Sequence, residues 1–275
     1  MSDLTFAEYA LVLREDYLPF VGRCFCDLNP QAKLAMHWHL EVIAAKLMEV
    51  REGKIRRLII NLPPRNLKSL MVSIAFPAWC LGHDPSAQIL CVSYAQDLAD
   101  KFARDCRSIM MAPWYRRIFA TRLAGHRQAV EEFITTRQGC RLATSTGGVL
   151  TGRGADIILI DDPLKPEDAL SEVLRRAANE WFDHTLYSRL NVVGTEQALL
   201  LAHGALQLRV FEPPAEETDE EEVLTFDTPG RAHREIAELG RLVGGVPALH
   251  DAVEVLRALA VAIAFEPRRL DQPAA

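Results

Sequence analysis

Two short apolar runs in this chain lead to side chains that can bind phosphate or metal. The first run, residues 58–60, leads through a proline-rich turn to the pair Lys68-Ser69. The second, residues 157–160, runs straight into the carboxylates of Asp161-Asp162. Continuous apolar runs of this length are typical of strands buried on both faces of a parallel sheet. We therefore expect the two polar ends to meet around one site at an edge of the sheet.

Helical and extended patterns alternate along the first two thirds of the chain. Helices are predicted over residues 36–52, 69–81, 96–111 and 167–187. Strands are predicted over residues 58–60, 88–94, 141–145 and 157–160. This alternation predicts an α/β fold, with a parallel sheet and helices on both faces.

The organisation changes near residue 211. Residues 212–222 are acidic and contain two prolines, which predicts a solvated linker. Beyond it, the apolar spacing from Leu249 to Ala260 predicts a helix. We divide the chain into a helical lead-in, an α/β domain, an acidic linker and a helical tail, at residues 1–35, 36–210, 211–230 and 231–275.

Bulk properties indicate a cytoplasmic protein. The N-terminus has no basic region followed by an apolar core, so no secretory signal is expected. The longest late apolar run, residues 258–265, is too short to cross a bilayer, and no membrane partner is expected. The six cysteines lack the usual zinc-binding spacing, which favours reduced thiols.

The turn before Lys68 has part of the pattern of a phosphate-binding loop. In such a loop, backbone N–H groups converge on the anion, the lysine reaches the β- and γ-phosphates, and the hydroxyl ligates Mg²⁺. Aligned on G-x-x-x-x-G-K-[ST], residues 62–69 keep the Lys-Ser pair but carry Leu62 and Leu67 where glycines are expected. The alternative is a Pro-Pro turn capped by Asn66 before an ordinary helix.

Asp161 and Asp162 supply the second part of a nucleotide site. A metal-bound triphosphate needs one carboxylate behind the Mg²⁺ and another to orient or deprotonate the attacking water. Adjacent strand residues point to opposite sides of the pleat, so the two can act on different atoms. A strand-end Asp-Asp-Pro turn without chemistry is the alternative. The conjunction of both motifs favours an ATP-hydrolysing site.

Residues from about 30 to 191 resemble the ATPase domain of the large terminase subunit, the motor that packages DNA in tailed phages and prophages. Four blocks in the same order carry the resemblance, at residues 59–69, 143–156, 160–166 and 179–191. The Pro-Pro-Arg-x-x-Lys-Ser loop is a variant phosphate loop of this family. The resemblance implies a P-loop NTPase fold of the ASCE type, with ATP and Mg²⁺ as ligands.

The resemblance also implies partners and roles for individual residues. Double-stranded DNA would be translocated by a homo-oligomeric ring, with the terminase small subunit and the portal protein as partners in the bacterial host cytoplasm. Lys68 would hold phosphate, Ser69 and Asp161 the metal, and Asp162 would be the catalytic acid. The nucleotide-binding loop would be completed by Pro64, Arg65, Asn66 and Leu67.

Four further residues have two interpretations each. Arg65 is a candidate for stabilising the γ-phosphate in the transition state, or a structural salt-bridge residue. Arg153 is a candidate sensor of nucleotide or of a neighbouring subunit, or a turn residue. Trp38 and His39 lie where these ATPases contact adenine, or simply begin a helix.

The sequence departs from the family after Asn191. Family members continue into a nuclease domain built on metal-binding acids, whereas the acids at residues 216–222 lack an apolar strand context, so nuclease activity is not expected. One hypothesis is an active packaging ATPase, and the alternative is a truncated prophage remnant that folds without turnover. Residues 101–141 carry nine Lys and Arg against three acids, which indicates either a polyanion-binding face or solvated helix faces.

Overall fold

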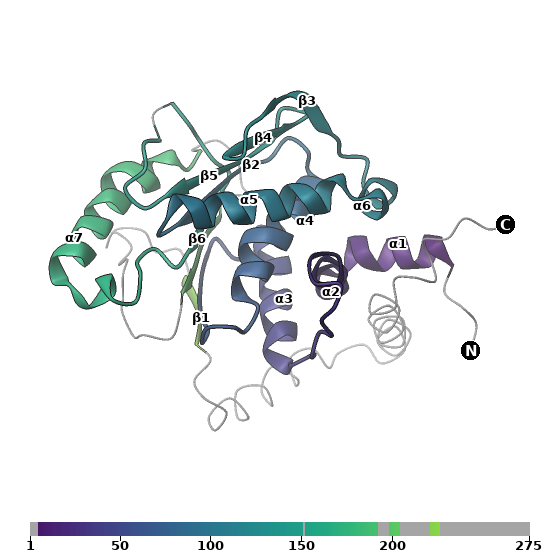
Figure 1. The fold of residues 1–275 in the computed structure, drawn as a ribbon, viewed down its shortest axis with the longest axis horizontal. Helices are drawn as coiled ribbons and strands as arrows, with labels where there is room; N and C mark the ends of the chain where they lie inside the picture. Colours follow the sequence, from purple (N-terminus) through teal and green to yellow (C-terminus); the bar gives the residue numbers. More distant parts are fainter. Residues whose placement is uncertain (1–4, 151, 192–197, 204–220, 226–275) are drawn as a thin grey trace.

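The computed structural model of the chain describes residues 5–150, 152–191, 198–203 and 221–225. Its centre is one eight-stranded sheet in the order β3-β4-β5-β2-β6-β7-β1-β8 (Figure 1). The strands are β1 Arg57–Asn61, β2 Gln88–Ser93, β3 Leu123–Gln128, β4 Glu132–Thr135, β5 Cys140–Ser145, β6 Ile157–Asp161, β7 Ala198–His203 and β8 Glu221–Thr225. The expected α/β class is confirmed. The sheet is mixed, however, because β4 at one end pairs antiparallel with both β3 and β5, while the other neighbouring strands pair in parallel.

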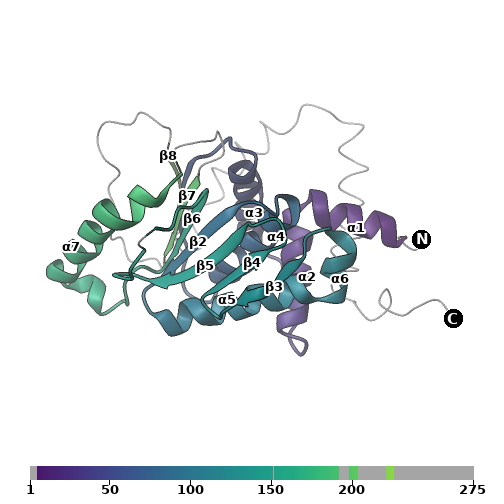
Figure 2. The same cartoon turned by 90° about the horizontal axis from the view of Figure 1, so that it is seen from above.

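Helices lie on both sides of this sheet. The helical segments are α1 Phe6–Glu15, α2 Tyr17–Leu28, α3 Trp38–Arg51, η1 Leu70–Ala75, α4 Phe76–His83, α5 Gln96–Met111, α6 Pro113–Ile118, η2 Asp168–Leu170, α7 Glu172–Trp181, η3 Phe182–Leu186 and η4 Tyr187–Arg189. Helices α2 to α5 cover one face, and α7 lies on the other side (Figures 1 and 2). None of the helices in the described ranges is long and apolar enough to span a bilayer.

Strand β6 shows how the apolar pattern builds the two faces. Ile157 and Leu159 belong to the core beneath α2 to α5, whereas Ile158 and Ile160 belong to a second core that includes η3. Successive side chains of a strand point to opposite faces, so a strand covered on both sides needs a continuous apolar run. The same alternation places Asp161 on the face of Ile157 and Leu159, beneath α2 to α5.

The predicted helices agree with the structure where a single apolar face of the helix packs against a single core. Helix α5 has both predicted ends, and α3 lies within the predicted range. The predicted helix over residues 69–81 begins instead as the π-helix η1 and continues as α4. The predicted helix over residues 167–187 is divided, because the Ser171 side chain accepts a hydrogen bond from Leu174 N and starts α7 after the 3-10 turn η2.

The edge of the sheet beside β1 differs from the sequence-based division. Residues 221–225 fall in the predicted acidic linker, but they form β8, which pairs with β1 in parallel register. The prediction of a solvated linker is therefore wrong for these five residues. Main-chain pairing with β1 does not depend on side-chain charge, and Leu224 packs against the main core. The rest of the predicted linker and the predicted tail lie outside the described residues.

Gly139 lies where two segments of main chain approach each other closely. A Cβ at this position would lie 2.4 Å from Pro85 O and 2.7 Å from Ala87 O. Carbonyl oxygens of the main chain cannot rotate away as a side chain can, so we expect Gly139→Ala to lower the free energy of unfolding by about 3 kcal/mol. Urea denaturation measures this change. Gly125→Ala is the matched control, because its Cβ would meet nothing within 4 Å. Equal effects of the two substitutions would contradict the packing argument.

Candidate functional site

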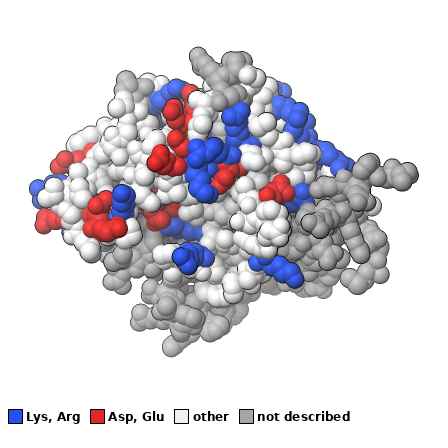
Figure 3. Space-filling view, in the orientation of Figure 1, with Lys and Arg blue, Asp and Glu red and all other residues white. Residues whose placement is uncertain are grey.

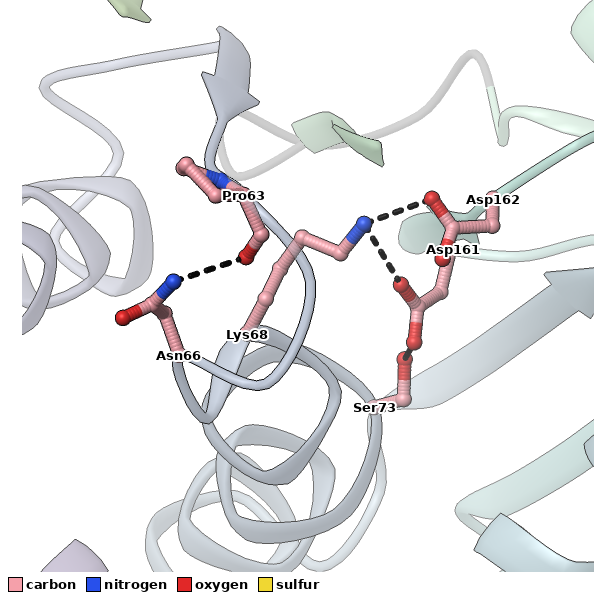
Figure 4. A network of polar contacts seen from close by, with 6 residues as sticks. All are labelled: Pro63, Asn66, Lys68, Ser73, Asp161 and Asp162. Carbon is pink, nitrogen blue, oxygen red and sulfur yellow. Dashed lines mark hydrogen bonds and ion pairs between the residues drawn. The ribbon is translucent and has the colours of Figure 1, made fainter. Parts of the chain in front are cut away.

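The two predicted motifs meet at one edge of the sheet. Lys68 Nζ lies 2.6 Å from Oδ1 of Asp162 and 3.7 Å from Oδ1 of Asp161 (Figure 4). Lys68 follows β1, Asp161 ends β6 and Asp162 comes directly after it, and β7 lies between these two strands. Because parallel strands end at the same edge of a sheet, the segments after β1 and β6 can meet across the end of β7.

Asp161 is the most buried charged group of this cluster, with 1% of its surface exposed. Burial raises the pKa of its carboxyl group above the ordinary value, against the Lys68 ammonium, which lowers it. The neighbouring Asp162 carboxylate adds to the rise of this pKa, and the hydroxyls of Ser69 and Ser73 oppose it. Nearby cations and hydrogen-bond donors therefore stabilise the ionised form of Asp161 against the effect of burial.

The two oxygens of Asp161 have different surroundings. Oδ2 accepts a hydrogen bond from the Ser73 hydroxyl at 3.0 Å. Oδ1 is buried and has no hydrogen-bond partner in the described part of the chain. A buried acceptor without a hydrogen bond is costly, so this oxygen is well suited to a cation that arrives with a ligand. Mg²⁺ commonly takes one or two carboxylates from the protein and its other oxygens from phosphates and water.

Backbone strain is concentrated at the same site. Four non-glycine residues in the described ranges have a positive φ, and three of them are here: Arg65 at 66°, Leu67 at 64° and Asp162 at 48°. The left-handed region costs an L-residue about 1–2 kcal/mol. Such strain persists only where the surrounding structure imposes it, and it clusters at functional sites.

Leu67 stands where the general phosphate-loop pattern has its second glycine. Its φ of 64° shows that the loop keeps the left-handed turn that a glycine would adopt without strain. The Leu67 side chain packs against the main hydrophobic core. Apolar burial therefore offsets the backbone strain at this position.

Asn66 closes the loop on itself. Its side-chain Nδ2 donates to the carbonyl oxygens of Pro63 at 3.0 Å and of Pro64 at 3.2 Å. The following helix has Ser69 as its N-cap, without a side-chain capping bond. The Asn66 amide therefore holds the Pro-Pro turn, and it does not cap the helix that follows.

A cavity of about 480 Å³ opens beside the loop. One wall carries the polar groups of Arg65, Lys68, Ser69 and Asp162. The other walls come from the end of α2 and from α5, with the apolar side chains of Phe25, Leu28 and Phe102 and the polar side chains of Asn29, Lys101 and Asp105. A cavity of this volume, with apolar walls and a few polar groups, is typical of a small-molecule site.

Four of the predicted nucleotide-binding residues do not line this cavity: Asn66, Trp38, His39 and Arg153. The predicted metal ligand Asp161 does not line it either. Arg153 forms an ion pair with Glu132 of β4, with Nη2 and Oε2 3.0 Å apart. His39 contacts the main chain of Asn66, and burial lowers its pKa more than that hydrogen bond raises it. The rings of Trp38 and His39 meet edge to face, at the start of α3. The structure brings His39 to the loop but does not bring Trp38 or Arg153 into the cavity.

The Arg-rich stretch at residues 101–141 does not form one continuous face. Arg141 is fully buried and donates to Ser73 O, and Arg122 donates to three main-chain carbonyls. The guanidinium of Arg117 lies over the Phe6 ring. On the face shown in Figure 3, Lys and Arg form separate groups with acidic side chains between them. Arg141, Arg122 and Arg117 therefore make contacts within the protein.

Sequence reasoning did not identify Ser73 as part of the site. The available signal was its position four residues after Ser69, which places both on the same side of a helix. Scans of the chain find no matching protein-family model and no matching curated protein.

Proposed function

We propose that this chain is a Mg-ATP hydrolase of the P-loop class. The observation that carries the proposal is the meeting of Lys68 with both aspartates beside a cavity of nucleotide size. In this proposal, Lys68 binds the β- and γ-phosphates, and Ser69 and Asp161 ligate Mg²⁺. When bound with the nucleotide, Mg²⁺ would neutralise negative charge on the β- and γ-phosphate oxygens.

The strand order supports the ASCE type within this class. ASCE ATPases take their name partly from an additional strand between the strand of the phosphate loop and the strand of the metal-binding carboxylate. In this chain β7 lies in that position, between β1 and β6. The helical segment formed by η1 and α4 follows the loop and packs beneath the sheet.

The two aspartates suit different tasks. Asp161 is buried and has one oxygen free of hydrogen bonds, which suits a metal ligand. Asp162 has 38% of its side chain exposed and lines the cavity, where it can hold and deprotonate the attacking water. Phosphates bound by Lys68 would compete with Asp162 for the ammonium and release the carboxylate for this role. Arg65, exposed on the cavity wall, is placed to stabilise charge on the γ-phosphate.

The resemblance to the large terminase subunit extends the proposal to a DNA-packaging motor. Hydrolysis would then drive double-stranded DNA through a ring of copies of this chain, with the small subunit and the portal as partners. The alternative is a folded remnant that does not turn over. The Lys68–Asp162 ion pair, which nucleotide must break, is the observation that favours this alternative.

Titration calorimetry of the full chain with Mg-ATP tests the proposal. We expect one site per chain, with a dissociation constant on the order of 10 μM and much weaker binding when Mg²⁺ is chelated. Phosphate release, measured with and without double-stranded DNA, separates the two alternatives. Stimulation by DNA supports the motor, and binding without turnover supports the remnant. Absence of nucleotide binding by the folded protein would contradict both.

A further inference from the structure

Ser73 connects the metal-facing carboxylate to a buried arginine. Its hydroxyl donates to Asp161 Oδ2 at 3.0 Å, and its main-chain carbonyl accepts from Arg141 Nη2 at 3.1 Å. Asp161 ends β6 and Arg141 lies in β5, with β2 between the two strands. Ser73, Asp161 and Arg141 are all buried. One residue of η1 therefore ties together two strands that are not neighbours in the sheet.

Strand register places these groups on the same face. Arg141 pairs with Ile89 of β2, and Asp161 pairs with Ser93 four residues further along the same strand. Residues with an even spacing along a strand point to one side. Ile89 belongs to the core beneath the helices, so Arg141 and Asp161 face that core as well. The segment η1 covers both residues, and the contacts of Ser73 with Asp161 and Arg141 lie across β2.

Ser73 lies in the middle of a π-helix. At the end of η1 the Phe76 N–H donates to Met71 O, five residues earlier, which is the wider π-helical turn. Such turns change the direction of the side chains that follow and are frequent at functional sites. Here the wider turn coincides with the residue whose carbonyl meets Arg141 and whose hydroxyl meets Asp161.

Arg141 is difficult to explain by stability alone. Its Nε and Nη1 are buried and have no hydrogen-bond partner among the residues that the structure describes. A buried guanidinium that is only partly bonded is destabilising relative to an apolar side chain of similar size. The charge of Arg141 acts on neighbouring groups. It lowers the pKa of Cys91 and of Cys106, although burial has the larger effect and raises both pKa values. A role in placing Ser73 gives this arginine a function.

We propose that Ser73 and Arg141 are positioning residues that hold the Asp161 carboxylate with Oδ1 turned toward the phosphate loop to receive a divalent cation. This inference rests on the proposed function, which brings a metal-bound nucleotide to that oxygen. Ser73 occupies Oδ2, so rotation of the carboxylate would break a buried hydrogen bond. Arg141 fixes Ser73 in turn by holding its carbonyl. Outer partners of metal ligands typically contribute about 10- to 100-fold to metal affinity.

The first test replaces Mg²⁺ by Mn²⁺ and measures its binding by electron paramagnetic resonance, with a non-hydrolysable ATP analogue present. We expect Ser73→Ala and Arg141→Met each to weaken Mn²⁺ binding by at least about tenfold. Affinity for the analogue without metal stays close to wild type, because Lys68 is unchanged. Ser73→Thr, which keeps the hydroxyl, restores Mn²⁺ binding. Wild-type Mn²⁺ affinity in Ser73→Ala overturns the inference.

The matched control is Thr121→Val. Thr121 is buried, and its hydroxyl donates to Leu81 O at 2.7 Å, away from the cavity lining. This substitution removes a buried hydroxyl without touching Asp161, so Mn²⁺ binding stays at the wild-type level. A tenfold loss in this control, equal to that of Ser73→Ala, would assign the effect to general destabilisation and overturn the inference.

A second test needs no nucleotide. In a double-mutant cycle of Ser73→Ala and Asp161→Asn, we expect the effects on the unfolding equilibrium constant to depart from additivity by about tenfold. Additive effects overturn the inference, whatever the nucleotide-binding result. Coupling in the cycle, with no nucleotide binding by the wild-type chain, overturns the proposed function instead.

Discussion

Replacement of Lys68 by alanine is expected to abolish Mg-ATP binding and to lower the free energy of unfolding by about 3 kcal/mol. The Lys68 side chain is 8% exposed and lies against two carboxylates, of which Asp161 is fully enclosed. Without the ammonium, Asp161 becomes a buried carboxylate with no neighbouring cation in the cluster described above. Titration calorimetry measures the loss of binding, and urea denaturation measures the loss of stability.

The destabilisation in Lys68→Ala has a defined pH dependence. Burial already raises the pKa of Asp161, and loss of the Lys68 ammonium, which lowers that pKa, raises it further. A carboxyl group whose pKa is raised by folding contributes stability at pH values below its unfolded-state pKa. That contribution is lost as the pH rises through the folded-state pKa. We therefore expect the cost of Lys68→Ala to be small in acid and full near neutral pH.

The double variant Lys68→Ala with Asp161→Asn separates stability from binding. The neutral amide removes the uncompensated buried charge, so most of the lost stability should return, whereas nucleotide binding should not. Binding of Mg-ATP by Lys68→Ala with wild-type affinity would show that the nucleotide site has been assigned to the wrong residues.

Asp162→Asn is expected to reduce the rate of ATP hydrolysis by about 10³-fold without weakening nucleotide binding, because the ion pair with Lys68 that nucleotide must break is lost. The substitution removes the carboxylate that orients or deprotonates water and keeps a side chain of the same shape. Asparagine is also tolerant of the left-handed main chain, so the φ of 48° at this position does not exclude it. Phosphate release under saturating Mg-ATP measures the rate, and calorimetry measures the affinity.

Asp105→Asn provides a matched control for Asp162→Asn. Asp105 also lines the cavity, but it belongs to α5 and pairs with Lys101 at 2.7 Å. We expect this variant to hydrolyse ATP at close to the wild-type rate. A comparable loss in both variants would mean that the charge of the cavity, and not the position of Asp162, controls turnover.

The parts of the fold that could be predicted are those in which the local spacing of apolar residues is compatible with only one type of secondary structure. The continuous apolar run of β6 predicts a strand buried on both faces, and the apolar stripe of α5 predicts a helix that packs one face against the core. Strand β8 could not be predicted in the same way. Its acidic residues favour a solvated segment locally, and only the free edge of β1 decides that they pair.

The candidate site shows the same division. Lys68, Asp161 and Asp162 could be chosen from the sequence because the aspartates come at the end of one apolar run and Lys68 comes after the turn that follows another. The importance of Ser73 and the burial of Arg141 could not, because each depends on which strands lie side by side beneath η1. In sequence, Arg141 is one basic residue among nine in its stretch.

The amino-acid sequence by itself determined the class of fold, the positions of the main strands and the residues that we propose for phosphate and metal binding. These depend on hydrophobic periodicity and on side-chain type, which are local properties. The tertiary structure decided the antiparallel end of the sheet, the pairing of β8, the left-handed loop at Leu67 and the buried contacts of Ser73. These depend on contacts between residues far apart in the chain, where packing and main-chain pairing outweigh local preference.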